Sequence, residues 1–278
     1  MAIVKSLVLT GYGINCEMEM AYANKLAGSE TTIAHINDCI DGHIDINHYH
    51  ILNFPGGFSY GDDLGSGQVF ANKLLYARTR RGLMMDHIRR FIDDGKLMIG
   101  ICNGFQILVN MGLLPAFDND DSARTAAIFY NDRGYRDCWV HLTINQKSQC
   151  IFTKGMDFLD APIRHGEGKF IPADKEVMNR LWEKGHIVMQ YADSNGRPTM
   201  DFPTNPNGSM EAIAGICNES GRVFGMMPHP EAFNHITNHP HYTRRREEFA
   251  RSQKPLPEEG DGIRIWRNAV EYAKENLL

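Results

Sequence analysis

The sequence contains no apolar run that approaches the roughly 18 residues needed to cross a bilayer, so we expect no membrane partner. It also lacks an excess of basic residues, because 29 Lys and Arg stand against 34 Asp and Glu, for a net charge of −5. Nucleic-acid-binding proteins favour a basic face, so we expect no nucleic-acid partner. The first residues read as a strand without a signal-peptide cleavage region, which favours a cytoplasmic location.

Cysteine is scarce and carries no metal or disulfide pattern. The six cysteines form no C-x-x-C pair, and a disulfide framework is not expected in a cytoplasmic chain of 278 residues. The sequence also lacks a P-loop or another phosphate cradle, so we expect no ATP site in this chain. The remaining question is whether one cysteine is reactive while the others fill the core.

Strands and helices alternate along the first 112 residues. Strand-like runs cover residues 4–10, 31–36, 50–54 and 97–101, and helical runs cover 17–27, 84–94 and 105–111. Each of these helical runs stops at a glycine, which is the favoured residue just beyond a helix end. The alternation predicts an α/β fold with a parallel sheet covered on both faces.

The second half of the chain has a different pattern. Strand-like runs at 139–144, 187–191, 211–216 and 222–227 are separated by polar turns, which predicts an antiparallel addition to the same sheet. The composition changes after residue 233. We therefore predict a domain at 1–233 and a C-terminal extension at 234–278 packed on it, ending in an amphipathic helix from about residue 261 to 276.

Cys102 is the cysteine with a catalytic context. It follows an apolar strand and precedes a helical run, in the frame G-x-C-x-G at residues 100–104. This frame is the cysteine analogue of the strand–turn–helix nucleophile elbow, in which glycines avoid clashes at a sharp turn. The turn would place the sulfur at the carboxyl edge of the sheet and at a helix N-terminus, which stabilises negative charge. The alternative is an inert cysteine in a core strand.

His229 and Glu231 have the spacing of a base and the group that orients it. Pro230 disfavours a helical conformation at His229, and in an extended chain residues i and i+2 point to the same side. Glu231 could then hold one imidazole nitrogen while the other faces a substrate. A surface His–Glu pair is one alternative. A metal site with His235, His239 and His241 is another, but their spacing fits no zinc pattern, so we predict no metal.

Six separated motifs together resemble the class I (triad-type) glutamine amidotransferases, and more closely the glutaminase subunits of phosphoribosylformylglycinamidine synthase. The resemblance covers roughly residues 4–233 and implies a flavodoxin-like open parallel sheet. The motifs are Gly-Ile-Asn-Cys-Glu at 13–17, Phe-Pro-Gly-Gly-Phe-Ser-Tyr-Gly-Asp at 54–62, Gly-Ile-Cys-Asn-Gly-Phe-Gln-Ile-Leu at 100–108, Arg-His-Gly-Glu-Gly at 164–168, Asn-Pro-Asn-Gly-Ser at 205–209 and Met-Pro-His-Pro-Glu at 227–231.

The resemblance implies a role for each of seven residues. Cys102 would attack the carboxamide carbon of glutamine and form a γ-glutamyl thioester, His229 would move protons, and Glu231 would hold His229. The backbone N–H groups of Gly57 and Asn103 would form the oxyanion hole, since a Gly-Gly turn lets the chain approach a ligand closely. Ser59 and Gln106 would contact glutamine. The 164–168 motif would lie near the site or at a partner interface, with no assigned role.

The resemblance also implies a complex. The ammonia would pass to a synthetase subunit for purine biosynthesis, and smaller members need a small third subunit as well. No cofactor is expected in this chain, and ATP and Mg²⁺ would bind the synthetase subunit. Where relatives usually continue with Tyr-Leu-Arg-Ala-Gly after residue 62, this chain has Asp-Leu-Gly-Ser-Gly at 63–67, so an aromatic residue and an arginine are missing.

Two alternatives remain at this stage. One is an amidotransferase that serves a different ammonia acceptor, which the Gly-Gly-Phe-Ser-Tyr-Gly-Asp run disfavours. The other is a non-enzymatic binding protein on the same scaffold, which would carry an elbow cysteine but would not need the Pro-His-Pro-Glu segment at 228–231.

Overall fold

A nine-stranded mixed sheet forms the centre of the protein. The computed structural model describes residues 2–278. The strand order is β2-β1-β3-β6-β13-β12-β11-β8-β9, and the first five strands run parallel. These are β2 (Glu30–His35), β1 (Lys5–Thr10), β3 (Ile51–Phe54), β6 (Leu97–Ile101) and β13 (Val223–Met226). The predicted parallel core is therefore confirmed, with the residues of β3 and β6 fully buried as the apolar runs indicate.

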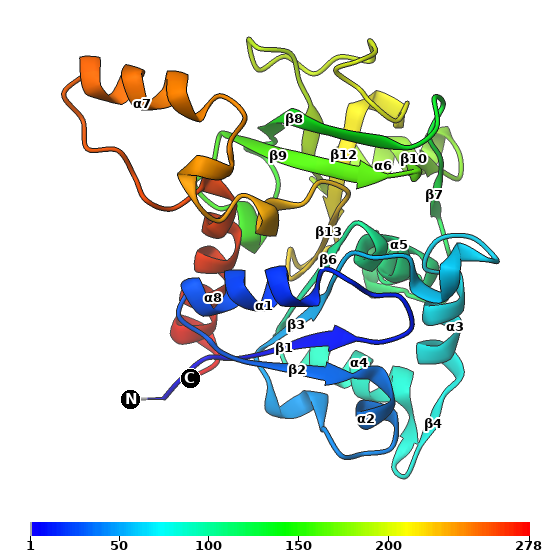
Figure 1. The fold of residues 1–278 in the computed structure, drawn as a ribbon. Helices are drawn as coiled ribbons and strands as arrows, with labels where there is room; N and C mark the ends of the chain where they lie inside the picture. Colours follow the sequence, from blue (N-terminus) through cyan, green and yellow to red (C-terminus); the bar gives the residue numbers. More distant parts are fainter. Residues whose placement is uncertain (1) are drawn as a thin grey trace.

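The other four strands add an antiparallel half to the same sheet. They are β12 (Ile213–Cys217), β11 (Ile187–Tyr191), β8 (Arg136–Ile144) and the edge strand β9 (Phe158–His165). Two small antiparallel ladders lie outside the sheet: β7 (Ala126–Tyr130) with β10 (Glu167–Pro172), and β4 (Arg78–Thr79) with β5 (Gly82–Leu83). This arrangement confirms the predicted antiparallel addition, which Figure 1 shows above the parallel half.

Helices cover both faces of the parallel strands (Figure 1). On one face α1 packs with α8, and on the other α5 packs with α3, which contacts α4. The helices are α1 (Glu17–Leu26), α2 (Ile36–Ile40), α3 (Gln68–Tyr76), α4 (Met84–Asp93), α5 (Asn103–Asn110), α6 (Lys175–Glu183), α7 (Tyr242–Arg251) and α8 (Arg264–Asn276). None of the helices in residues 2–278 combines the length and apolar composition that spanning a membrane requires.

The two helices of the C-terminal segment differ in how they pack. α8 buries Ile265, Trp266 and Val270, and the Trp266 indole N–H donates to Asn53 Oδ1 in β3 at 3.1 Å. α7 has no buried side chain and stands apart from the sheet at the upper left of Figure 1. The predicted terminal amphipathic helix is thus confirmed, and its buried face packs against β3. The boundary between residues 233 and 234 stays a prediction.

Candidate active site

Cys102 occupies a sharp turn between β6 and α5. Its backbone lies at φ 51° and ψ −108°, a conformation that non-glycine residues rarely adopt and that functional sites hold under strain. A Cβ on Gly104 would lie 1.9 Å from the Phe54 carbonyl oxygen, and one on Gly100 would lie 2.6 Å from the Gly104 carbonyl carbon. Both glycines of the frame are therefore sterically required, because β3, β6 and α5 meet too closely for a side chain.

His229 and Glu231 are joined by a short hydrogen bond. His229 Nδ1 lies 2.6 Å from Glu231 Oε1, and His229 is anchored by its own N–H, which donates to the Pro162 carbonyl at 2.8 Å. The predicted non-helical conformation of His229 is confirmed, at φ −106° and ψ 82°. The extended path from His229 to Glu231 was wrong, because the chain forms a 3₁₀ turn there, η6 (Pro230–Ala232). Proline is favoured at the first position of such a turn, and the turn brings the two side chains together.

The His–Glu pair is sequestered from solvent. His229 is 2% exposed and Glu231 is 0% exposed. Burial by itself lowers the pKa of His229, but the Glu231 carboxylate and the neighbouring Cys102 outweigh it and raise the pKa above the ordinary value. His229 Nε2 has no hydrogen-bond partner within residues 2–278. This nitrogen is therefore free to exchange a proton with a reacting group.

The two predicted oxyanion donors flank Cys102. The Gly56 carbonyl accepts hydrogen bonds from the Asn15 and Cys16 N–H groups, both at 3.2 Å, so the N–H of the next residue in this trans peptide, Gly57, points the opposite way. Asn103 is the first residue of α5, where helix N–H groups lack internal acceptors. Neither N–H donates to another atom of residues 2–278. Their role stays a prediction that this geometry permits.

A cavity of about 260 Å³ opens beside Cys102, and Gly57, Gln106 and Glu167 are among the residues that line it. The Gln106 side chain lines the cavity, but both ends are engaged: Nε2 donates to the Glu167 carbonyl at 2.6 Å, and Oε1 accepts from Asn103 Nδ2 at 2.9 Å. Ser59 is not among the described lining residues. It is buried and donates its N–H to Asn103 Oδ1 at 3.3 Å. Direct glutamine contacts by Ser59 and Gln106 stay predictions.

Cys16 also lies at the active site, a position that was not predicted from the sequence. A Cβ placed on Gly56 would lie 2.7 Å from His229 Cε1, 3.3 Å from Cys16 Sγ and 3.4 Å from Cys102 Cβ, so these three side chains converge around one glycine. Burial raises the pKa of the Cys16 thiol, which keeps it neutral and separates it chemically from a nucleophile. The available signal was the 13–17 motif, to which no role was assigned.

One group of potential metal ligands involves the same residues. Cys16, His229 and Glu231 each bring a ligand atom within 4.8 Å of the others. Of the histidines after residue 233 that were considered as ligands, His235 Nδ1 lies 2.7 Å from Thr237 Oγ1, and His239 Nε2 lies 3.1 Å from Asp160 Oδ2. Within residues 2–278 these histidines join no ligand cluster with His229. The expected absence of a metal stays a prediction.

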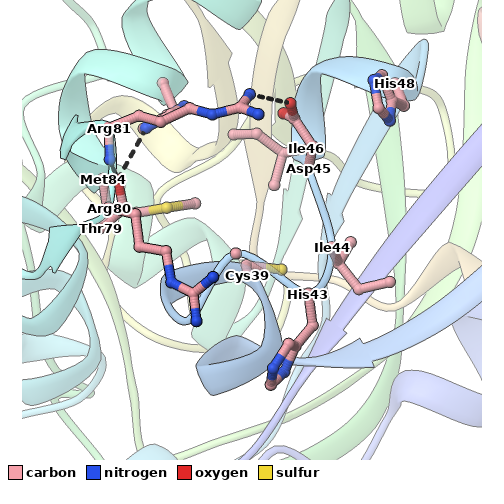
Figure 2. Close-up of a pocket in the computed structure, with 12 residues that line it drawn as sticks. Cys39, His43, Ile44, Asp45, Ile46, His48, Thr79, Arg80, Arg81 and Met84 are labelled. Carbon is pink, nitrogen blue, oxygen red and sulfur yellow. Dashed lines mark hydrogen bonds and ion pairs between the residues drawn. The ribbon is translucent and has the colours of Figure 1, made fainter.

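A second cavity, of about 350 Å³, lies elsewhere and shares none of its described lining residues with the cavity at Cys102 (Figure 2). Arg81 pairs with Asp45 across it at 3.5 Å. Its cysteine, Cys39, is a neutral thiol, because burial and the Asp38 and Asp45 carboxylates raise the pKa to about 12. Nothing in this cavity resembles the base and nucleophile arrangement at Cys102.

Comparisons with known proteins agree with this geometry. Residues 4–273 match the CobB/CobQ-like glutamine amidotransferase domain family. The chain is 45% identical over 273 residues to phosphoribosylformylglycinamidine synthase subunit PurQ of Methanococcus maripaludis, covering 97% of each chain. It is 42% identical over 276 residues to the PurQ subunit of Dehalococcoides mccartyi, covering 99% and 100% of the two chains.

The same relationship is seen in three dimensions. A chain in the structure of PurLQS from Thermotoga maritima superposes with a TM-score of 0.67 at 28% sequence identity. The superposition covers 98% of this chain and 99% of the other. The likeness therefore extends over the catalytic half, the antiparallel addition and the C-terminal segment.

Proposed function

The chain belongs to the CobB/CobQ-like glutamine amidotransferase family, and on that premise we propose that it is the glutaminase subunit of a phosphoribosylformylglycinamidine synthase, with Cys102 as nucleophile. It hydrolyses glutamine and supplies ammonia for purine biosynthesis. The observation that supports the chemistry best is the 2.6 Å bond between His229 Nδ1 and Glu231 Oε1, buried beside a strained Cys102.

In the first half-reaction His229 Nε2 takes the thiol proton of Cys102, Sγ attacks the carboxamide carbon of glutamine, and the carbonyl π electrons move onto oxygen. The N–H groups of Gly57 and Asn103 stabilise that oxyanion, because they are preformed donors without competing acceptors among the described residues. Collapse of the tetrahedral intermediate breaks the C–N bond. His229 Nε2 gives the leaving nitrogen its proton, which leaves ammonia and a γ-glutamyl thioester.

In the second half-reaction a water molecule replaces ammonia. His229 Nε2 takes a proton from the water, which attacks the thioester carbonyl. When the C–S bond breaks, His229 returns this proton to Cys102 Sγ, so that glutamate and the free thiol are left. Glu231 fixes the ring so that Nε2 faces the reaction, and its charge stabilises the imidazolium that forms in each half.

The ammonia acceptor lies on another subunit. The Thermotoga maritima relative is part of PurLQS. We propose that this chain likewise acts with a synthetase subunit and a small third subunit. We propose that ATP and Mg²⁺ bind the synthetase, since glutamine hydrolysis as described uses a thiol, an imidazole and a carboxylate. We also propose a cytoplasmic location, which the six free thiols of the described chain support because a reducing compartment keeps cysteines unpaired.

The direct test of the nucleophile is a pair of cysteine variants. Cys102→Ala should lower glutamine hydrolysis by about 10³-fold or more, because triad members act as a unit. The fold should survive, since the change removes only a sulfur. Glutamate release would be assayed with the synthetase present, and the γ-glutamyl adduct would be sought by mass spectrometry on the peptide that contains Cys102.

The matched control is Cys138→Ala, which removes an exposed thiol away from the cavity. This variant should keep the wild-type rate. Equal losses in the two variants, or an adduct on the Cys16 peptide, would show that Cys102 is not the nucleophile.

A further inference from the structure

The 164–168 turn is held by hydrogen bonds along its whole length. Each of its five consecutive carbonyl oxygens accepts a hydrogen bond from outside the turn. In chain order the donors are the Cys102 thiol at 3.9 Å, the Asn131 side chain at 2.8 Å, the Asn131 N–H at 2.9 Å, the Gln106 side chain at 2.6 Å and the Asn207 side chain at 2.9 Å. The turn is therefore fixed in register with the start of α5.

That register places Glu167 in the cavity beside Cys102, together with Asp62. Glu167 Oε2 accepts the Ser66 N–H at 3.2 Å. Asp62 Oδ1 is buried without a hydrogen-bond partner in residues 2–278. Burial, and then the nearby Glu167 charge, raise the pKa of Asp62. Both carboxylates thus occupy one wall of the cavity and repel each other.

This acidic wall has no positive charge opposite it. Neither Glu167 nor Asp62 forms an ion pair with a Lys or Arg anywhere in residues 2–278. None of the described residues that line the cavity is a Lys or Arg. Both residues are half-buried, and a carboxylate partly removed from water without a cation is unfavourable, so a cationic ligand group would be favoured here.

The spacing suits one particular ligand group. In glutamine the reacting carboxamide carbon and the α-nitrogen are about 5 Å apart, as four bonds of ordinary length allow. Cys102, Asp62 and Glu167 line the same cavity of about 260 Å³. A glutamine with its carboxamide at Cys102 can therefore reach the acidic wall with its ammonium group.

We propose that Glu167, with Asp62 behind it, is the subsite that binds the α-ammonium group of glutamine. This assignment rests on the proposed glutaminase function and gives the 164–168 motif a role. It also makes the site selective, because an amide without the α-amino group leaves the half-buried carboxylates uncompensated.

The test compares glutamine with glutaramate, the same molecule without its α-amino group, using the chain in complex with its synthetase. Glu167→Gln removes the charge but keeps an oxygen that can accept the Ser66 N–H. We expect kcat/KM for glutamine to fall roughly 10- to 100-fold, mainly through KM, because a charge-assisted contact is lost. The value for glutaramate should stay within about threefold, so the preference for glutamine collapses.

Glu183→Gln is the control, because it removes the same charge from an exposed helix position outside the cavity. It should leave both substrates unchanged. Equal losses on both substrates in Glu167→Gln would mean that Glu167 only positions the turn, and the ammonium assignment would be wrong.

Three further results separate the remaining outcomes. If Glu167→Gln does not fold, Asp62→Asn tests the same wall: a reduced preference for glutamine supports the subsite, and an unchanged preference overturns it. If the wild-type complex releases no glutamate from glutamine, the proposed glutaminase function itself is wrong. If it does and the preference survives both variants, only the subsite fails.

Discussion

His165 and His186 are two histidines that burial keeps neutral. His165 is 2% exposed and His186 is 1% exposed. Burial, followed by the nearby charge of His229, lowers the pKa of His165 to about 3. Burial likewise lowers the pKa of His186 to about 4, with the Glu219 carboxylate opposing the shift. None of their ring nitrogens has a hydrogen-bond partner in residues 2–278, so no hydrogen bond stabilises the charged form of either ring.

These histidines should make the fold sensitive to acid. Below pH 6.5 the unfolded chain takes up protons that the folded chain refuses until about pH 4, so the free energy of unfolding falls as pH falls. Each group contributes up to ~1.4 kcal/mol per pH unit. His186→Gln should therefore flatten the dependence measured by urea unfolding between pH 7 and pH 5, and the exposed His43→Gln should not. Parallel curves for wild type and His186→Gln would contradict this.

Residues with a local steric signature could be assigned from the sequence, and residues that act through long-range contacts could not. Gly100 and Gly104 indicate the turn at Cys102, because only glycine fits at these two positions. Cys16 reaches the site because its N–H bonds the Gly56 carbonyl, 40 positions along the chain. No pattern within residues 13–17 encodes that pairing, so only the fold shows it.

Among the elements, α5 is placed by its contact with β3. In an exposed helix, alanine in place of glycine is stabilising by about 1 kcal/mol. At Gly104 the sign should reverse, because the new Cβ would press on the Phe54 carbonyl at 1.9 Å. We expect Gly104→Ala to destabilise the fold by roughly 1–3 kcal/mol, and to lower glutaminase activity as Cys102 shifts.

Thermal unfolding and glutamate release would be measured together for this variant. Gly28→Ala is the comparison, because a Cβ there meets nothing within 4 Å although φ is 95°. It should lose stability through backbone strain alone and keep its activity. A Gly104→Ala protein with wild-type stability and activity would show that α5 can move away from β3 freely.

Elements with clean periodicity matched the sequence prediction, and β9 was missed for a physical reason. Pro162 lies inside β9, and proline argues against a central strand. β9 is the edge of the sheet, where one row of N–H groups needs no strand partner. Its Asp160 binds His141 and Arg245 rather than alternating with apolar residues. Because β9 is an edge strand and carries ion-paired side chains, it lacks the continuous apolar run from which β3 and β6 were predicted.

For the molecule in its complex, the coupling of glutamine hydrolysis to the synthetase is the main expectation. Free ammonia would diffuse away, so hydrolysis without an acceptor is wasteful. We expect the isolated chain to hydrolyse glutamine weakly, and its rate to rise roughly 5- to 150-fold with the synthetase, ATP and formylglycinamide ribonucleotide. Steady-state glutamate release with and without these components measures this. An isolated chain already at the full rate would contradict the coupling.

The position of the oxyanion peptide indicates where such coupling would act. The Gly56 carbonyl is fixed by two N–H groups of the 13–16 segment, so the Gly57 N–H keeps its direction only while that segment stays in place. Asn15→Pro removes one of the two donors. It should reduce the ratio of the glutamate-release rate with the synthetase to the rate without it. The variant should remain folded.

The hydrogen bond from Trp266 to Asn53 spans 213 positions of sequence. β13, which carries the chain into His229, inserts beside β6 and Cys102. During synthesis, more than a hundred residues must therefore emerge between the nucleophile and its base, and α8 must emerge before β3 is covered. Such distant contacts fold slowly and leave apolar strands open meanwhile. We therefore expect a nascent chain to lack glutaminase activity until α8 has left the ribosome.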